Sequence, residues 1–243
     1  MIETFQNLFA PPRHMILLIV ATWLGLTLAE KRTEQHNISK DDLNNITFYG
    51  MIAFVLGGRL TYILQNISAF TKSPLDIISI NPDLFDPIGA LAIAFIVVFA
   101  YAQRKQLPLW NILDALTLFF AVIAIGLGLS HLAAGTAFGT PTKLPWGINL
   151  WNATRHPTQL YDAIASSLIL VLLWLFKPKL RPGILFLFFI ALTALSQLIT
   201  QTFRADTTFI FNGVRQPQVL AWVTLLLCFF IIETRLNIKR ADS

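Results

Sequence analysis

Seven long apolar runs dominate the chain and leave it few ways to fold. A helix needs about 20 apolar residues to cross the hydrocarbon core of a bilayer, and the shorter runs reach that length with flanking residues. Because a helix satisfies its own backbone hydrogen bonds in lipid, the pattern predicts an all-α membrane protein with seven transmembrane helices. We expect residues 1–243 to form a single membrane domain. The runs cover residues 15–29, 46–64, 87–102, 109–134, 160–176, 183–203 and 219–233.

Composition supports a membrane protein and argues against a nucleic-acid partner. Hydrophobic residues make up 55% of the chain and charged residues 13%, compared with about 25% charged in a soluble domain. The net charge of +5 would suit a polyanion, but the basic residues lie in short loops between apolar runs. In such loops they set membrane orientation.

The distribution of basic residues predicts the orientation. Of the 18 Lys and Arg residues, eleven fall in connections on one side, six fall on the other, and Arg59 lies inside a run. The positive-inside rule then places the N-terminus outside and the C-terminus in the cytoplasm. The first run lacks a small-residue cleavage site before Glu30, so we expect it to be retained as a helix.

Metal and thiol chemistry find little support in the sequence. The lone cysteine, Cys228, lies within the last apolar run, where a small buried hydrophobic role is expected. The four histidines have no Cys or His neighbours at ligand spacing. We therefore expect no metal and no cofactor.

The stretch between the fourth and fifth runs concentrates ionisable residues beside apolar sequence. Its loop holds Lys143 and then Arg155-His156-Pro157. Proline in a first helical turn explains a helix start there whatever the function. An Arg and a His placed together at that start also suit an anion and a proton transfer, so we favour a functional role. His131, in the fourth run, is more typical of a packing or interhelical hydrogen-bond residue.

Two further features place polar groups inside apolar runs. Arg59 lies near the outer end of the second run, on a face that also carries Tyr62. A charge there needs a partner, which could be a lipid phosphate or, alternatively, an interhelical acid such as Asp162. The sixth run carries a polar stripe that could line a substrate cavity or serve as hydrogen-bonded contact between helices. The stripe consists of Thr193, Ser196, Gln197, Thr200, Gln201 and Arg204.

Four motifs follow one another along the chain, namely Gly58-Arg59-x-x-Tyr62-Ile63-Leu64, Gly139-x-Pro141-Thr142-x-Leu144-Pro145-Trp146, Arg155-His156-Pro157-x-Gln159-Leu160-Tyr161 and Phe203-Arg204. In this order they resemble the prolipoprotein diacylglyceryl transferases, which are seven-helix enzymes with an outside N-terminus. The resemblance implies a multi-pass protein of the bacterial cytoplasmic membrane. It also implies transfer of a diacylglyceryl group from phosphatidylglycerol, or another anionic phospholipid, to the lipobox cysteine thiol of a prolipoprotein signal peptide, with release of glycerol phosphate.

The resemblance also implies roles for individual residues. Arg59 and Arg204 would hold the lipid phosphate, and His156 with Tyr161 would shape the opening of the site and serve its proton transfer. The remaining lipid-binding positions would be Tyr62, Arg155, Gln159 and Gln201.

Several signature positions differ from the family pattern. The family's Arg-x-Gly-Asn-x-x-x-Gly-Glu falls on residues 128–136, so its Arg falls on Gly128, its Asn on His131 and its Glu on Thr136. Its His-Gly-Gly is replaced by a segment beginning at Asp86, and a family Glu by Gln201. Losing such groups removes several kcal/mol of transition-state stabilisation.

Asp86 as a replacement base and His131 as a replacement donor would, with His156, complete the catalytic set. The alternative is a family member that binds phospholipid or acts as a scaffold without catalysis. A transporter is less favoured, because no inverted repeat is visible.

Overall fold

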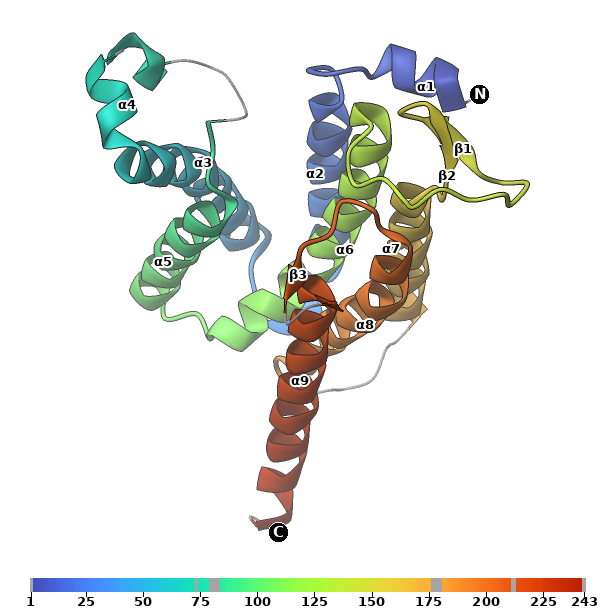
Figure 1. Ribbon diagram of the computed structural model, residues 1–243. Coiled ribbons are helices and arrows are strands. Elements are labelled where there is room, and N and C mark those ends of the chain that lie inside the picture. The colour runs from blue at the N-terminus through green and yellow to red at the C-terminus, as the bar shows by residue number, and fades with distance from the viewer. Residues whose placement is uncertain (1, 73, 79–83, 176–180, 211–212, 242–243) are drawn as a thin grey trace. The chain divides into compact units, whose positions relative to one another are not determined.

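The computed structural model describes residues 2–72, 74–78, 84–175, 181–210 and 213–241 (Figure 1). Its contacts divide the chain into two compact units, which are described separately. Unit 1 consists of Met1–Arg32 with Leu113–Ser243, and unit 2 of Thr33–Ile112. The prediction of a single domain stays a prediction.

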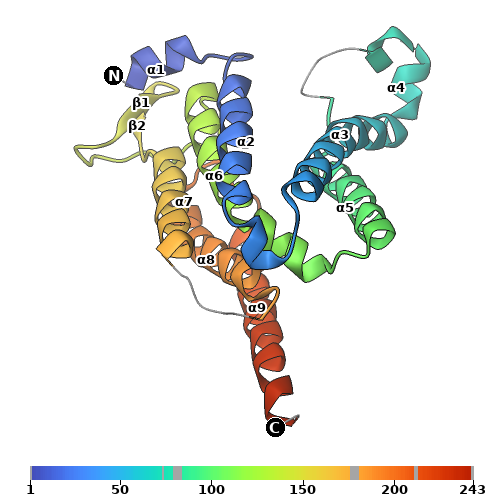
Figure 2. The ribbon, with the colours of Figure 1, turned by 180° about the vertical axis from the view of Figure 1, so that it is seen from behind.

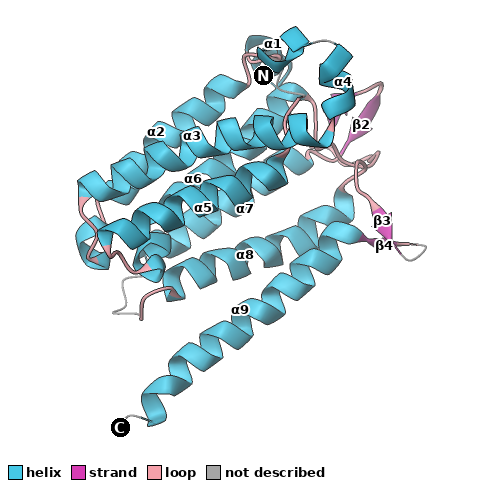
Figure 3. Ribbon diagram, turned by 90° about the vertical axis from the view of Figure 1, so that its left-hand side faces the viewer, coloured by secondary structure: helices cyan, strands magenta, loops and turns pink. Residues whose placement is uncertain are grey.

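Unit 1 is a bundle of apolar helices with short hairpins at one end (Figures 1 and 2). The strand pairs β1–β2 and β3–β4 are antiparallel hairpins. We call the end of unit 1 that carries them the hairpin end. Figure 3 shows β3 and β4 where the paired helices α8 and α9 join. The elements are α1 (Ile2–Leu8), α2 (Met15–Glu30), α6 (Leu109–Ala134), β1 (Ile148–Leu150), β2 (Ala153–Arg155), α7 (Thr158–Leu175), α8 (Ile184–Thr200), the 3₁₀ turn η3 (Gln201–Phe203), β3 (Phe209–Ile210), β4 (Val214–Arg215) and α9 (Gln216–Ala241).

Small residues let the helices of unit 1 approach closely. A Cβ added to Gly126 of α6 would lie 2.4 Å from the Cβ of Ala21 in α2. Such contacts are how helices pack where lipid supplies no hydrophobic driving force. The core itself joins α6, α7 and α8, and its buried members are Leu118, Ala121, Ile169, Leu173, Leu185 and Phe189.

Unit 2 pairs two long helices through glycines as well. A Cβ on Gly89 would lie 2.2 Å from Oγ1 of Thr61, which shows how closely α3 and α5 approach. The polar first turns of α3 are helical because Ser39 caps them, its Oγ accepting from the Asp42 amide at 3.0 Å. The helices of unit 2 are α3 (Lys40–Gln65), α4 (Ile67–Lys72) and α5 (Pro87–Lys105), with 3₁₀ turns η1 (Thr33–His36) and η2 (Pro74–Ile78).

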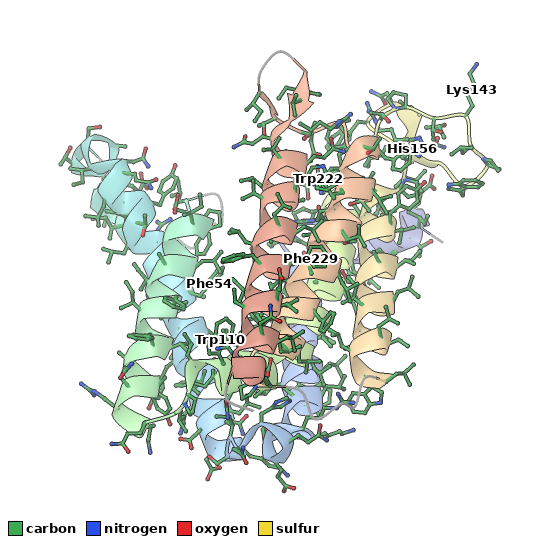
Figure 4. The ribbon with its side chains drawn as sticks, turned by 90° about the horizontal axis from the view of Figure 1, so that it is seen from below. Phe54, Trp110, Lys143, His156, Trp222 and Phe229 are labelled. Carbon is green, nitrogen blue, oxygen red and sulfur yellow. The ribbon has the colours of Figure 1, made fainter. Side chains whose placement is uncertain are left out.

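The helices are those of a membrane protein. Among the described residues, six are long and apolar enough to cross a bilayer, namely α3, α5, α6, α7, α8 continued to Phe203, and α9, while α2 is apolar but shorter. Large apolar side chains cover their outer faces, as Trp222 and Phe229 do on α9 (Figure 4). The predicted all-α membrane fold is confirmed, and its orientation stays a prediction.

Asp114 fastens α6 to the start of α8. Its side chain is buried, and its carboxylate accepts from the amides of Gly183 at 2.6 Å and Phe186 at 2.9 Å. The first amides of a helix have no partner within the helix. The acid of α6 therefore caps the N-terminus of α8.

We expect Asp114→Ala to lower the free energy of unfolding by about 2 kcal/mol, because two amides lose a charged acceptor. Thermal unfolding of the detergent-purified protein measures the change. Thr117→Val is the control, since among the described residues the Thr117 hydroxyl bonds only the Leu113 carbonyl of its own helix. Equal stability of the Asp114→Ala variant and wild type would contradict the capping role.

Candidate functional site

The loop that follows α6 forms the centre of the candidate site. Its residues 138–142 run between the chain leaving α8 and the chain approaching α7. The Thr140 amide donates to the Phe203 carbonyl at 2.8 Å, and the Thr140 carbonyl accepts from the His156 amide at 3.0 Å. Two further backbone bonds extend the pairing, from Ala205 to Phe138 at 3.0 Å and from Thr142 to Thr154 at 2.8 Å.

Gly139 brings two predicted site residues to one place. It is bridged to Arg204 on one side. On the other side, a Cβ at this position would lie 2.3 Å from the carbonyl oxygen of His156 and 2.6 Å from its Cβ. Only glycine allows so close an approach, so the backbone positions of Arg204 and His156 depend on the same residue.

The imidazole of His156 sits in an aromatic cluster at the hairpin end (Figure 4). The ring centroid of Phe203 lies 4.9 Å away, and that of Tyr161 lies 6.2 Å away. Nδ1 of His156 is 3.3 Å from the Tyr161 hydroxyl oxygen, and that oxygen accepts from Nε1 of Trp146 at 2.9 Å. Lys143, on the same loop, projects away from the bundle (Figure 4).

Arg204 forms ion pairs with two carboxylates. Its Nη1 lies 3.5 Å from Asp162 of α7, and its Nε lies 3.1 Å from Asp206. The side chains of Arg204 and Asp162 are 17% and 14% exposed, so this pair is poorly screened by solvent. The guanidinium is balanced by protein acids, and an incoming anion would exchange with them.

The polar stripe of α8 faces α7 and continues inward from that ion pair. Nε2 of Gln201 donates to Gln197 at 3.0 Å, and Nε2 of Gln197 donates to Asp162 at 3.1 Å. The bond to Asp162 joins α8 to α7, as expected if the stripe serves as hydrogen-bonded contact between helices. Buried oxygens of Thr193, Thr200 and Gln201 have no partner within the described part of the chain, so the alternative of a polar cavity also stays open.

The side chains of Arg155 and Gln159 donate hydrogen bonds to backbone carbonyls of the loop. Nε of Arg155 donates to the Leu150 carbonyl at 3.0 Å and its Nη1 to the Gly139 carbonyl at 3.2 Å. Gln159 is fully buried, and its Nε2 donates to the Thr136 carbonyl at 2.8 Å. The predicted lipid contacts of Arg155 and Gln159 stay predictions, and the bonds seen here support the loop backbone.

The two α6 positions that depart from the family pattern differ in their surroundings. His131 is half-buried and lies near enough to Arg204 and Asp162 for electrostatic interaction. Gly128 lies against α7, and a Cβ there would be 3.0 Å from the Cβ of Ala163 and 3.0 Å from the carbonyl oxygen of Gln159. The place of the family's arginine is therefore a close helix contact in this chain.

Arg59 of unit 2 turns its guanidinium to the backbone that follows α3. Its Nη1 donates to the Leu84 carbonyl at 2.8 Å, and its Nη2 donates to the Asp76 carbonyl. Its buried Nε has no partner among the described residues. Asp162, the acid named as an alternative partner of Arg59, pairs with Arg204 within unit 1. An ion pair between Arg59 and Asp162 stays a prediction.

Tyr62 and Asp86 complete the predicted positions in unit 2. The Tyr62 ring packs edge-on against Phe70 at 6.3 Å. Asp86 caps α5 by accepting from the Gly89 amide, and its second oxygen accepts from Gln65 at 3.4 Å. The predicted roles of Arg59, Tyr62 and Asp86 in the functional site stay predictions.

The sequence did not indicate Gly139 as a support or Trp146 as a partner of Tyr161. Gly139 is one of 12 glycines, and its role depends on pairing with segments far away in the chain. A tryptophan in a polar loop was the available signal for Trp146, because its indole N–H can only donate and needs an acceptor.

Comparisons with known proteins identify the family of the chain. The family model described as prolipoprotein diacylglyceryl transferase matches residues 13–234. The phosphatidylglycerol–prolipoprotein diacylglyceryl transferase of Clostridium tetani is 26% identical over 220 residues, covering 86% of this chain and 87% of the relative. That of Thermotoga maritima is 28% identical over 246 residues, with 94% and 83% covered. That of Bordetella avium is 32% identical over 162 residues, with 63% and 60% covered.

The family match spans all seven apolar helices, from α2 to most of α9. With those helices, the protein is a multi-pass protein of the cell membrane. The motif order, the helices and the matched span agree, and the chain belongs to the prolipoprotein diacylglyceryl transferase family.

Proposed function

We propose that this protein transfers a diacylglyceryl group from phosphatidylglycerol to the cysteine thiol of a prolipoprotein. The thiol loses its proton to a base, and the sulfur attacks the glyceryl carbon that carries the phosphate. A carbon–sulfur bond forms while the carbon–oxygen bond to phosphate breaks. Glycerol phosphate leaves with the electron pair.

The observation that carries the proposal is that the backbones of a cationic residue, Arg204, and of His156 lie on either side of Gly139. The planar guanidinium of Arg204 matches the oxygen pair of a phosphate. Phosphate would take the place of Asp162 and Asp206 on that guanidinium, and charge growing on the leaving group would be stabilised there.

The backbone of His156 lies on the other side of Gly139 from Arg204, and its imidazole can exchange a proton with the substrate. His131 serves as a donor near Arg204, and Asp86 as a replacement base. Arg59 serves as a further cation for a lipid phosphate. With the N-terminus outside, the site opens to the outer face of the membrane, where an anionic phospholipid and a prolipoprotein signal peptide both arrive.

The test uses the full-length protein in detergent with phosphatidylglycerol and a lipobox peptide. Mass spectrometry should detect the peptide with a diacylglyceryl thioether, and no such product with a peptide whose cysteine is replaced by serine. Absence of product from folded protein that still binds the lipid would overturn the proposal and leave a non-catalytic lipid-binding protein.

Two variants test the replacement roles. Asp86→Asn keeps an oxygen for the Gly89 amide, and His131→Gln keeps a donor of similar reach. We expect Asp86→Asn to lower the transfer rate because the base is lost, and His131→Gln to preserve more activity than His131→Ala. Unchanged rates in Asp86→Asn and His131→Ala would remove both residues from the site.

A further inference from the structure

Two segments fix the orientation of the His156 ring. Phe203, at the end of η3, stacks at 4.9 Å in a tilted arrangement. Tyr161, in the first turn of α7, meets the Phe203 ring edge-on at 5.9 Å. With both neighbours in place, the imidazole presents Nδ1 to the Tyr161 hydroxyl at 3.3 Å.

The hydrogen bond from Trp146 determines whether the Tyr161 hydroxyl acts as donor or acceptor toward His156. Nε1 of Trp146 donates to the Tyr161 oxygen at 2.9 Å, and an indole nitrogen can only donate. One lone pair of the phenol oxygen is therefore occupied. The phenol proton of Tyr161 remains available as a donor. Within the aromatic cluster, the acceptor in reach of it is Nδ1 of His156.

The tautomer of neutral His156 follows from this order of donors. If Nδ1 carried the proton, the phenol oxygen would receive two donors while its own proton had no acceptor in the cluster. If Nδ1 is bare, Trp146 donates to Tyr161 and Tyr161 donates to His156, so the indole and phenol protons both have acceptors and Nε2–H is left for the substrate. A neutral imidazole protonates one nitrogen and leaves the other as acceptor.

We propose that Trp146 and Tyr161 are positioning residues that hold neutral His156 with its proton on Nε2. This inference rests on the proposed function. It assigns the direction of the hydrogen bonds from Trp146 to Tyr161 and from Tyr161 to His156. His156 would then meet the substrate as a donor at Nε2. A phosphate oxygen of the departing group is a suitable acceptor, whereas a thiol proton would need a bare nitrogen.

The loop offers a matched pair of tryptophans for the test. Trp146 and Trp151 are 57% and 62% exposed, and each donates from Nε1 at 2.9 Å. Trp151, however, donates to the Gly135 carbonyl and has no bond to the cluster. Replacement by phenylalanine removes one indole donor in either case, so only Trp146→Phe should affect His156.

The experiment is nitrogen NMR of the detergent-solubilised protein labelled with ¹⁵N-histidine, with His156→Gln identifying the signals of this residue. At a pH where His156 is neutral, wild type should show a bare Nδ1 and a protonated Nε2. Tyr161→Phe should convert this pattern to a mixture of tautomers. Trp146→Phe should shift the Nδ1 signal, and Trp151→Phe should leave it unchanged.

Transfer activity supplies the second readout. Losing one aligned hydrogen bond of about 1 kcal/mol should lower kcat of Trp146→Phe by about fivefold, with little change in KM for lipid. Trp151→Phe should stay near wild type.

A protonated Nδ1 in wild type, or an unchanged tautomer in Tyr161→Phe, would overturn the inference. Equal loss of activity in Trp146→Phe and Trp151→Phe would also overturn it, by assigning the effect to the loop as a whole. If no variant, wild type included, transfers lipid, the proposed function fails while the NMR result still decides the tautomer.

Discussion

Replacing Arg204 by Gln should lower the rate of diacylglyceryl transfer by about 10²–10³-fold, the usual effect of losing one group that stabilises developing negative charge. Gln fills similar space and keeps one donor, but it cannot offer a charged fork to phosphate. The rate is measured with the lipobox peptide and mass spectrometry. Lys143→Gln is the control, because Lys143 is an exposed cation at the same end of unit 1 (Figure 4).

A second variant separates catalysis from folding. Arg204→Gln leaves the half-buried carboxylate of Asp162 without its cation, and such a loss destabilises a fold by up to about 3–5 kcal/mol. Adding Asp162→Asn removes the unpaired charge, so the double variant should regain thermal stability and stay inactive. Recovery of activity in the double variant would show that Arg204 acts only by neutralising Asp162.

Gly128→Arg restores the arginine that the family resemblance places at this position, yet we expect it to unfold the protein. The Cβ alone would lie 3.0 Å from both the Ala163 amide nitrogen and the Gln159 carbonyl oxygen. These are backbone atoms of α7 and cannot rotate away. Overpacking of this kind costs about 3 kcal/mol or more, measured as a loss of melting temperature and of monodisperse protein in detergent.

Gly128→Ala is a milder test of the same contact between α6 and α7, because it adds only the Cβ. It should cost about 1 kcal/mol and keep most of the transfer activity. A Gly128→Arg variant that is as stable as wild type and more active would contradict the close packing of α6 on α7.

The apolar runs predicted the helices because burial in lipid depends on composition along one segment. Their ends were less predictable. The second run begins at residue 46, whereas α3 begins at Lys40, since Ser39 caps a polar first turn that an apolar pattern does not contain. In the same way, α9 extends to Ala241 beyond the apolar residues 219–233.

The site was predictable as a set of residues and less so as a set of contacts. The polar stripe of α8 indicated one face of a helix, but not that Asp162 of α7 would accept from Gln197 and pair with Arg204. Pairing across helices depends on their rotation, which one sequence does not specify. The support of His156 by Gly139 likewise depends on three segments meeting in space.

The shared place of Gly139 between Arg204 and His156 ties the two side chains to one short piece of backbone. Inserting or deleting a single residue between Ala137 and Pro141 would shift both pairings at once and put a side chain where only a hydrogen fits. Cation and imidazole therefore cannot be repositioned one at a time by changing loop length. An engineer who wishes to move either of them has to rebuild the segment for both.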